Sequence, residues 1–116
     1  MKPTVLVIIS SDPRTSPRPA EAIRIAAGVG AWQKADVTVC LCEAAVLALS
    51  ERVEGLVDED KFTDYLPLLG QSGRPVYVET GVPLLKDLGN SPVNYERVSV
   101  AQLAQIAARS NYVMRF

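Results

Sequence analysis

Histidine is absent from this chain of 116 residues. The absence removes the commonest general base, metal ligand and side chain that titrates near neutral pH. It excludes Ser-His-Asp and Cys-His catalysis and the HExxH type of metalloprotease, and it argues against a tetrahedral zinc site within one chain. We therefore expect neither a bound metal nor a cofactor.

The chain also lacks an excess of charge of either sign, because it has 12 basic and 13 acidic residues and a net charge of −1. This near balance gives no electrostatic reason to expect nucleic acid or an anionic membrane as a partner. No apolar run approaches the roughly 18 residues of a membrane span. The first four residues lead directly into a predicted strand and lack the pattern of a signal peptide. We expect a cytoplasmic protein.

Cysteine is scarce, with Cys40 and Cys42 as its two occurrences. In an extended strand their side chains point to the same face, with Cα atoms about 6.5 Å apart. That separation is near the upper limit for a disulfide, and a ring closed over one intervening residue is strained. We expect both to be reduced thiols.

Apolar patterning predicts strands that alternate with helices. Residues 4–9 form a continuous β-branched run, which is typical of a strand covered on both faces. Further strands are expected at 35–42, 75–79 and 112–116, and helices at 20–34, 43–53, about 60–70 and 100–109. Pro67 should kink or shorten the third helix, and the long segment 80–95 could hold one helical turn at 83–88. This order predicts one domain over residues 1–116: a three-layer α/β/α sandwich of flavodoxin-like build with a mainly parallel sheet of four or five strands.

Several segments carry a resemblance to a known family. They are the strand 5–9 with its Ser/Pro loop and Ala-rich helix, the stretch VTVCLCEAAV at 37–46, the helix and Pro-Val strand at 62–79, and the ending at 95–104 and 112–116. Their order and spacing resemble the DsrE/DsrF-like (DsrEFH) family, which includes YchN-type proteins and the TusC and TusD sulfur-relay subunits. The resemblance implies a five-stranded parallel sheet between helices, assembly into trimers or hexamers, and a role in handling sulfur with other sulfur-relay proteins.

Glu79 departs from the pattern of that family. Catalytic members carry cysteine at the end of the Pro-Val strand, whereas here Glu79 stands there and residues 80–90 contain no cysteine. Sulfur transfer needs a thiolate, which a carboxylate cannot replace. Glu79 could act as a general base if burial raised its pKa, but an ordinary carboxylate at a strand end is the favoured interpretation. The resemblance then implies a structural or binding subunit, as in cysteine-free TusC-type members.

Cys42 offers a second route to sulfur chemistry. It is expected at the carboxyl end of the second strand, where doubly wound sheets bind ligands, and directly before a helix whose N-terminus would lower a thiol pKa. It could thus be a persulfide carrier, with Arg14 or the helix N-terminus stabilising the thiolate. The favoured alternative is a small buried side chain that fills space, and Cys40, one pleat deeper, is expected in the core.

The loops at the ends of the first and third strands suggest a third possibility. Hydroxyls, an arginine and a helix N-terminus can together hold a small anion, and the candidate ligand-binding residues are Ser10, Ser11, Arg14, Thr15, Thr80 and Gly81. The first loop lacks the glycines of a nucleotide-binding turn. Its three prolines, Pro13, Pro17 and Pro19, suit a stiff pocket rim or a subunit contact equally well.

The chain has more large apolar side chains than a monomer of this size is expected to bury in its core. Trp32, Tyr65, Tyr77, Leu84 and Leu85 are the residues expected to leave apolar surface. Such patches usually mark an interface. We expect a homo-oligomer, and the resemblance implies a trimer or hexamer.

Overall fold

A computed structural model describes residues 2–71 and 75–116. In chain order, its elements are β1 (Thr4–Ile9), α1 (Arg18–Ala31), β2 (Asp36–Leu41), the 3₁₀ helix η1 (Glu43–Leu49), α2 (Glu59–Gln71), β3 (Val76–Glu79), the 3₁₀ helix η2 (Pro83–Asp87), β4 (Tyr95–Val98), α3 (Val100–Arg109) and β5 (Tyr112–Arg115). The five strands form one sheet in the order β4-β3-β2-β1-β5, and every pairing is parallel. The predicted fold class is confirmed.

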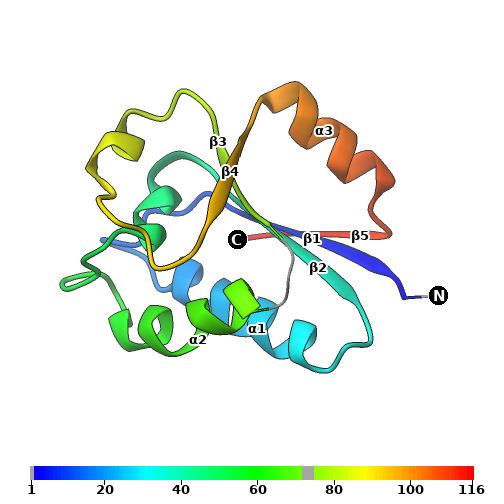
Figure 1. Cartoon of the computed structure of the whole chain (residues 1–116), viewed down its shortest axis with the longest axis horizontal. Coiled ribbons are helices and arrows are strands. Elements are labelled where there is room, and N and C mark those ends of the chain that lie inside the picture. The colour runs from blue at the N-terminus through cyan, green and yellow to red at the C-terminus, as the bar shows by residue number, and fades with distance from the viewer. Residues whose placement is uncertain (1, 72–74) are drawn as a thin grey trace.

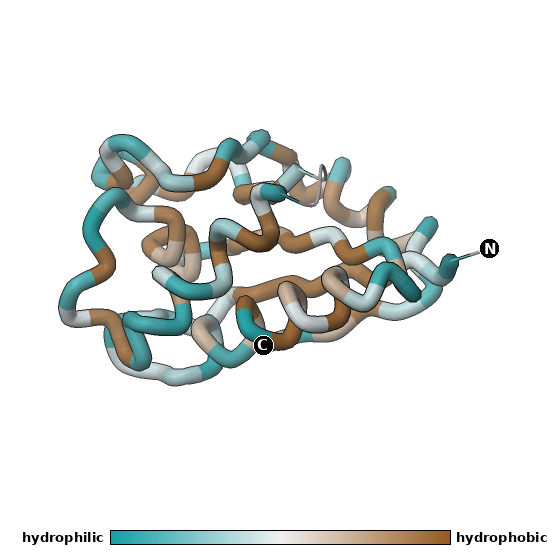
Figure 2. Tube along the Cα trace, turned by 60° about the horizontal axis from the view of Figure 1, so that its bottom comes forward, coloured by the Kyte–Doolittle hydropathy of each residue, from teal (hydrophilic) through white to brown (hydrophobic). Residues whose placement is uncertain are grey.

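The sheet separates two layers of helices, with α1 and α2 on one side and α3 on the other (Figure 1). Side chains of a strand alternate between its faces, so Val7 and Ile9 join the large core under α1 and α2 while Leu6 and Ile8 face α3. This two-sided burial explains why the first strand is apolar without interruption. Figure 2 shows these hydrophobic strands running through the middle of the molecule.

The two helical layers differ in how closely they are covered. Among residues 2–71 and 75–116, twenty-one buried residues form the core on the side of α1 and α2, whereas five form the core beneath α3. No residue of α3 is itself fully buried. The sheet face below α3 therefore has a thinner cover than the opposite face.

The start of α3 is the element that its sequence specifies most clearly. Ser99 accepts a hydrogen bond from the Gln102 backbone N–H (3.1 Å), and the Gln102 side chain accepts one from the Ser99 N–H (2.8 Å). This reciprocal capping box satisfies two backbone donors that a helix start leaves free. The prediction of a helix over Val100–Arg109 is confirmed.

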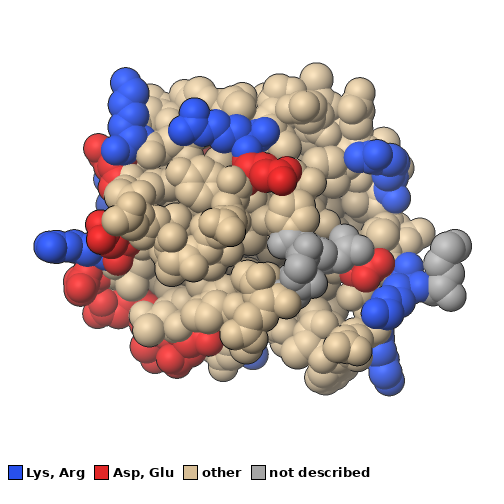
Figure 3. Space-filling model, in the orientation of Figure 1, with Lys and Arg blue, Asp and Glu red and all other residues tan. Residues whose placement is uncertain are grey.

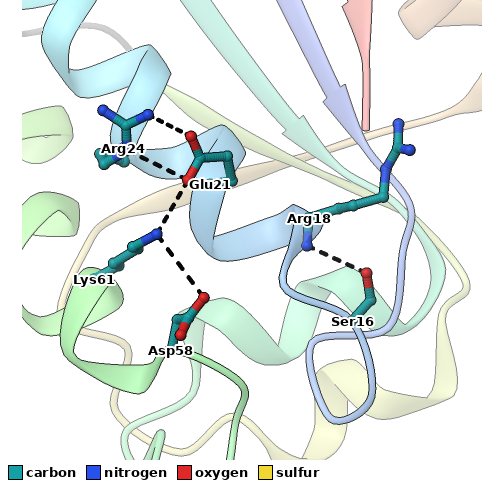
Figure 4. Close-up of polar contacts among 6 residues, drawn as sticks. All are labelled: Ser16, Arg18, Glu21, Arg24, Asp58 and Lys61. Atoms are coloured by element: carbon teal, nitrogen blue, oxygen red, sulfur yellow. Dashed lines mark hydrogen bonds and ion pairs between the residues drawn. The ribbon is translucent and has the colours of Figure 1, made fainter.

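Charged side chains connect α1 to α2 (Figure 4). Glu21 accepts hydrogen bonds from Arg24 on its own helix and from Lys61 Nζ on α2 (3.0 Å), and Lys61 also lies 3.8 Å from Asp58. The Arg24 and Lys61 bonds lower the pKa of Glu21 to about 2. The carboxylate thus stays charged over the whole neutral range and fixes the relative positions of the two helices.

The segment expected to be an α-helix at 43–53 is instead a 3₁₀ helix that ends at Leu49. Glu43 starts it with a φ of +52°, a left-handed conformation from which a regular α-helix does not begin. Ala45, Val46, Ala48 and Leu49 are all buried. Because these residues must all contact the core, the backbone of the segment follows the shape of the core and not the periodicity of an α-helix.

Two other helix boundaries also differ from expectation. Pro67 does not shorten α2, which continues to Gln71. Pro67 is exposed, so water can reach the carbonyl that loses its partner, while the buried Leu66 and Leu69 anchor the helix on both sides. The first helix spans Arg18–Ala31 instead of 20–34, because Gln33 takes a left-handed φ of +56° beyond its end.

The apolar surface lies elsewhere than predicted. Tyr65, Leu84 and Leu85 pack against the core under α1 and α2, and Tyr77 packs on the opposite side of the sheet, so these residues do not form one patch. Trp32 alone of the predicted set is highly exposed, at 76%. The other exposed large apolar residues are Leu68 on α2, Val100 on α3, and Tyr112, Val113 and Met114 on β5. Most of this surface therefore belongs to α3 and the edge strand β5.

Among the helices of residues 2–71 and 75–116, none has the length and apolar character needed to cross a membrane.

Candidate functional site

Cys42 and Glu79 are brought side by side by the register of the sheet. Cys40 is aligned with Tyr77 and Leu41 with Val78 on the neighbouring strand, so the next step of the register aligns Cys42 with Glu79. Cys42 follows β2 in an extended conformation, and its N–H donates to the Ile9 carbonyl at 2.8 Å, which keeps it in the plane of the sheet. Neighbouring strands lie about 4.8 Å apart. The position that the resemblance marks as active thus borders a thiol on the next strand.

The two cysteines form a close pair on the α3 side of the sheet. Both are free thiols, and their Sγ atoms lie 4.0 Å apart. Cys40 is 0% exposed and Cys42 is 6% exposed. Leu6, Ile8 and Val98 complete the buried cluster around them. The expectation that Cys40 lies in the core is confirmed, and Cys42 forms the outer member of the pair.

The sulfur atoms influence one another's protonation. The pKa of Cys42 is lowered mainly by the hydrogen bond with Cys40, against the opposing effects of burial and of the Glu79 and Glu43 carboxylates; Arg115 adds to the lowering. The pKa of Cys40 is raised by that same hydrogen bond, by burial and by the charges of Cys42 and Glu79. The two pKa values thus move in opposite directions, with that of the outer sulfur, Cys42, lowered.

The cause of this pKa shift differs from the one that the sequence suggested. The helix after Cys42 is a short 3₁₀ helix and not an α-helix, so an aligned helix dipole does not supply the stabilising charge. Arg14 does not supply it either, because its guanidinium binds Asp12 through Nε (3.0 Å) and Nη2 (2.8 Å). The cation that acts on Cys42 is Arg115 of β5.

The loop residues predicted to bind a small anion lie at the carboxyl ends of β1 and β3. Ser10 donates its N–H to the Phe116 carbonyl, and Thr80 donates its N–H to the Val98 carbonyl, each at 2.9 Å. Ser10, Arg14, Thr15, Thr80 and Gly81 are exposed and Ser11 is half-buried. Gly81 has a φ of +84°, so the turn after β3 needs a residue without a side chain. Arg14, the only cation among the predicted anion-binding residues, is already paired with Asp12. This pairing gives no support for an anion site there.

The sequence did not reveal three neighbours of the thiols, which are Arg115, Tyr77 and Glu43. Arg115 is aligned with Ile8, and Ile8 with Cys40, so Arg115 and Tyr77 belong to the same row across the sheet as Cys40. The alternation of side chains along each strand could have indicated these faces. The order of the strands, which decides which residues share a row, could not be obtained from that alternation.

Comparison with known proteins gives a structural match and no sequence match. Neither a scan against models of protein families nor a search of curated proteins finds a match for this chain. Among solved structures, the chain is similar to the crystal structure of the YchN protein from E. coli, with a TM-score of 0.77 over 100% of both chains and 19% sequence identity. The chain has the YchN fold. This finding confirms the fold that the resemblance implied.

Proposed function

We propose that this chain is a DsrE/DsrF-like domain of intracellular sulfur handling that serves as a binding or structural subunit. The observation that carries the proposal is the position of Glu79 at the end of β3, in a chain with the YchN fold over its whole length. Glu79 is half-buried, and the resemblance implies that catalytic members carry their cysteine at its position. A carboxylate cannot hold sulfane sulfur, so the domain would recognise partners or ligands without carrying the atom itself.

A second candidate function is a persulfide carrier that uses Cys42. The hydrogen bond between Cys42 and Cys40 and the charge of Arg115 lower the pKa of Cys42 and so favour its thiolate. A thiolate is the nucleophile in sulfur transfer. Burial and the two carboxylates act against it, and 94% of the surface of Cys42 is covered. We therefore rank this function second.

Incubation with a sulfur donor distinguishes the two candidates. The reduced protein would be treated with sodium polysulfide, desalted and weighed intact by mass spectrometry. A binding or structural subunit keeps its original mass, whereas a carrier gains about 32 Da, the mass of one sulfur atom. The variant Cys42→Ser is the matched control: a gain in the wild type that this variant loses would replace the first proposal with the second.

We also propose that the chain forms a homo-oligomer through the surface of α3 and β5. Val100 is 69% exposed and Tyr112 is 64% exposed, although both are large apolar residues, and α3 covers its face of the sheet only thinly. Large apolar side chains exposed on neighbouring elements are typical of interfaces. The edge strand β5 adds a row of backbone groups that no other strand of the described residues pairs on its outer side.

Light scattering coupled to size exclusion tests this arrangement at micromolar concentration. The wild type is expected to elute with the mass of a trimer or hexamer. Val100→Glu and Tyr112→Glu each place an unpaired charge in the interface and should shift the protein toward the monomer. Trp32→Glu is the control, because Trp32 lies beyond the end of α1 and is not part of this surface. A monomeric wild type would refute the oligomer, and dissociation by Trp32→Glu alone would move the interface to α1.

A further inference from the structure

The spacing of Cys40 and Cys42 is unsuited to a disulfide. Side chains two residues apart on a strand stand parallel, so their Cβ atoms are separated by about 6.5 Å, like their Cα atoms. A disulfide needs Cβ atoms about 3.5–4.5 Å apart. Closing the bond would therefore require the backbone of a buried central strand to buckle. The pair is not arranged for oxidation, yet its sulfur atoms lean to within 4.0 Å of each other.

The same spacing suits one atom held between two thiolates. A metal–thiolate bond is about 2.3 Å long for zinc, so a linear S–metal–S unit with such bonds spans about 4.6 Å. The sulfur atoms at 4.0 Å would need to separate by only about 0.6 Å to take up such an ion. Small rotations of two side chains can supply that movement without any change of the backbone.

The surroundings decide which kind of ion could be held. Leu6, Ile8 and Val98 enclose the thiols with apolar surface. Within residues 2–71 and 75–116, no three His, Cys, Asp or Glu side chains are grouped closely enough to form a metal site. Zinc sites need three or four protein ligands, and iron–sulfur clusters are held by four. Soft thiolates also select copper(I), a closed-shell monovalent ion that is stable with two ligands.

The charges near the outer sulfur favour a cation over an anion. Within the described part of the chain, the carboxylates of Glu79 and Glu43 raise the pKa of Cys42, and Arg115 acts in the opposite direction. Figure 3 shows acidic side chains gathered on the left and lower left of the molecule, away from α3, which covers the side of the sheet that holds the thiols. The Glu79 and Glu43 carboxylates near Cys42 raise the local concentration of cations. Arg115 would in turn balance the single negative charge of a copper(I) bis-thiolate.

We propose that Cys40 and Cys42 together bind one copper(I) ion in a two-coordinate site. Binding forms two copper–sulfur bonds and releases the two thiol protons to water, with no change in the oxidation state of metal or sulfur. Cys42, the less buried of the two at 6% exposure, is the outer ligand, and Cys40 is the inner ligand. The affinity rises with pH, because both ligands must be deprotonated.

A competition titration measures this binding directly. The reduced full-length chain would be titrated under nitrogen with copper(I) held by bathocuproine disulfonate, whose absorbance reports the copper that the protein removes. One equivalent per chain is expected. Cys40→Ser and Cys42→Ser should each weaken binding by more than the roughly 10–100-fold that loss of an outer-shell partner costs. No uptake by the wild type, or full affinity in either variant, would overturn the proposal.

Two further measurements keep the test independent of how well the serine variants fold. X-ray absorption of the wild-type complex should show a shell of two sulfur atoms around copper, and a shell of three or four ligands would contradict the two-coordinate site. Glu43→Gln should weaken binding a few-fold by removing a negative charge near Cys42. Glu59→Gln on α2, across the sheet, makes the same change in charge and should have no effect. Tight 1:1 binding of zinc(II) by the wild type would also overturn the proposal.

Discussion

Glu79→Cys is expected to turn the chain into one that holds sulfane sulfur. The substitution places a thiol at the end of β3, in the row that contains Cys42 and on the side of the sheet where α3 lies. The position is half-buried, which leaves access from solvent while limiting side reactions. After polysulfide treatment, the variant should gain about 32 Da while the wild type keeps its mass.

Two variants control this experiment. Glu96→Cys adds a thiol to the same face one strand further out, because Glu96 is aligned with Tyr77 and Glu79 with Val98. If Glu96→Cys takes up as much sulfur as Glu79→Cys, the uptake is a property of any exposed thiol. The result would then not support a sulfur-binding pocket at position 79. Glu79→Gln removes the charge without adding a thiol. Because the Glu79 carboxylate raises the pKa of Cys42, sulfur uptake by Glu79→Gln would identify Cys42 as the carrier.

The sequence predicted the fold because its signals are local and agree with one another. The apolar run of β1, the capping box at Ser99 and the alternation of strands with helices each depend on neighbours in the chain. The errors arose where the tertiary structure outweighs local preference. Pro67 remains inside a helix because buried leucines on both sides of it hold α2 in place. The segment after Cys42 forms a 3₁₀ helix because four of its residues must fit the core.

The candidate site was predictable only in part for the same reason. Cys42 and Glu79 could each be placed at a strand end, but their adjacency depends on β2 and β3 being neighbours in register. Arg115 lies 73 positions after Cys42 in the sequence, and its effect on that thiol depends on β5 pairing with β1. Contacts of this kind are set by the order of strands in the sheet, which no local pattern encodes.

Phe62→Ala is expected to cause a large loss of stability. The Phe62 side chain is 1% exposed and is the largest fully buried side chain in the described part of the chain. It projects from α2 into the main core together with Leu66 and Leu69, at the i, i+4 and i+7 positions of one helical face. Truncating a buried phenylalanine costs about 3–5 kcal/mol in the free energy of unfolding. A domain of this size has only about 5–15 kcal/mol in total.

Urea denaturation followed by circular dichroism measures the effect, with Leu68→Ala as the matched control on the same helix. Leu68 is 45% exposed, so its truncation should change the free energy of unfolding by no more than about 1 kcal/mol. Both variants must be compared at one protein concentration, because assembly would add to the apparent stability. A loss below about 1 kcal/mol for Phe62→Ala would mean that Phe62 is not packed in the core between α2 and the sheet. In that case α2 would not help to hold β2 and β3, and with them Cys42 and Glu79, in position.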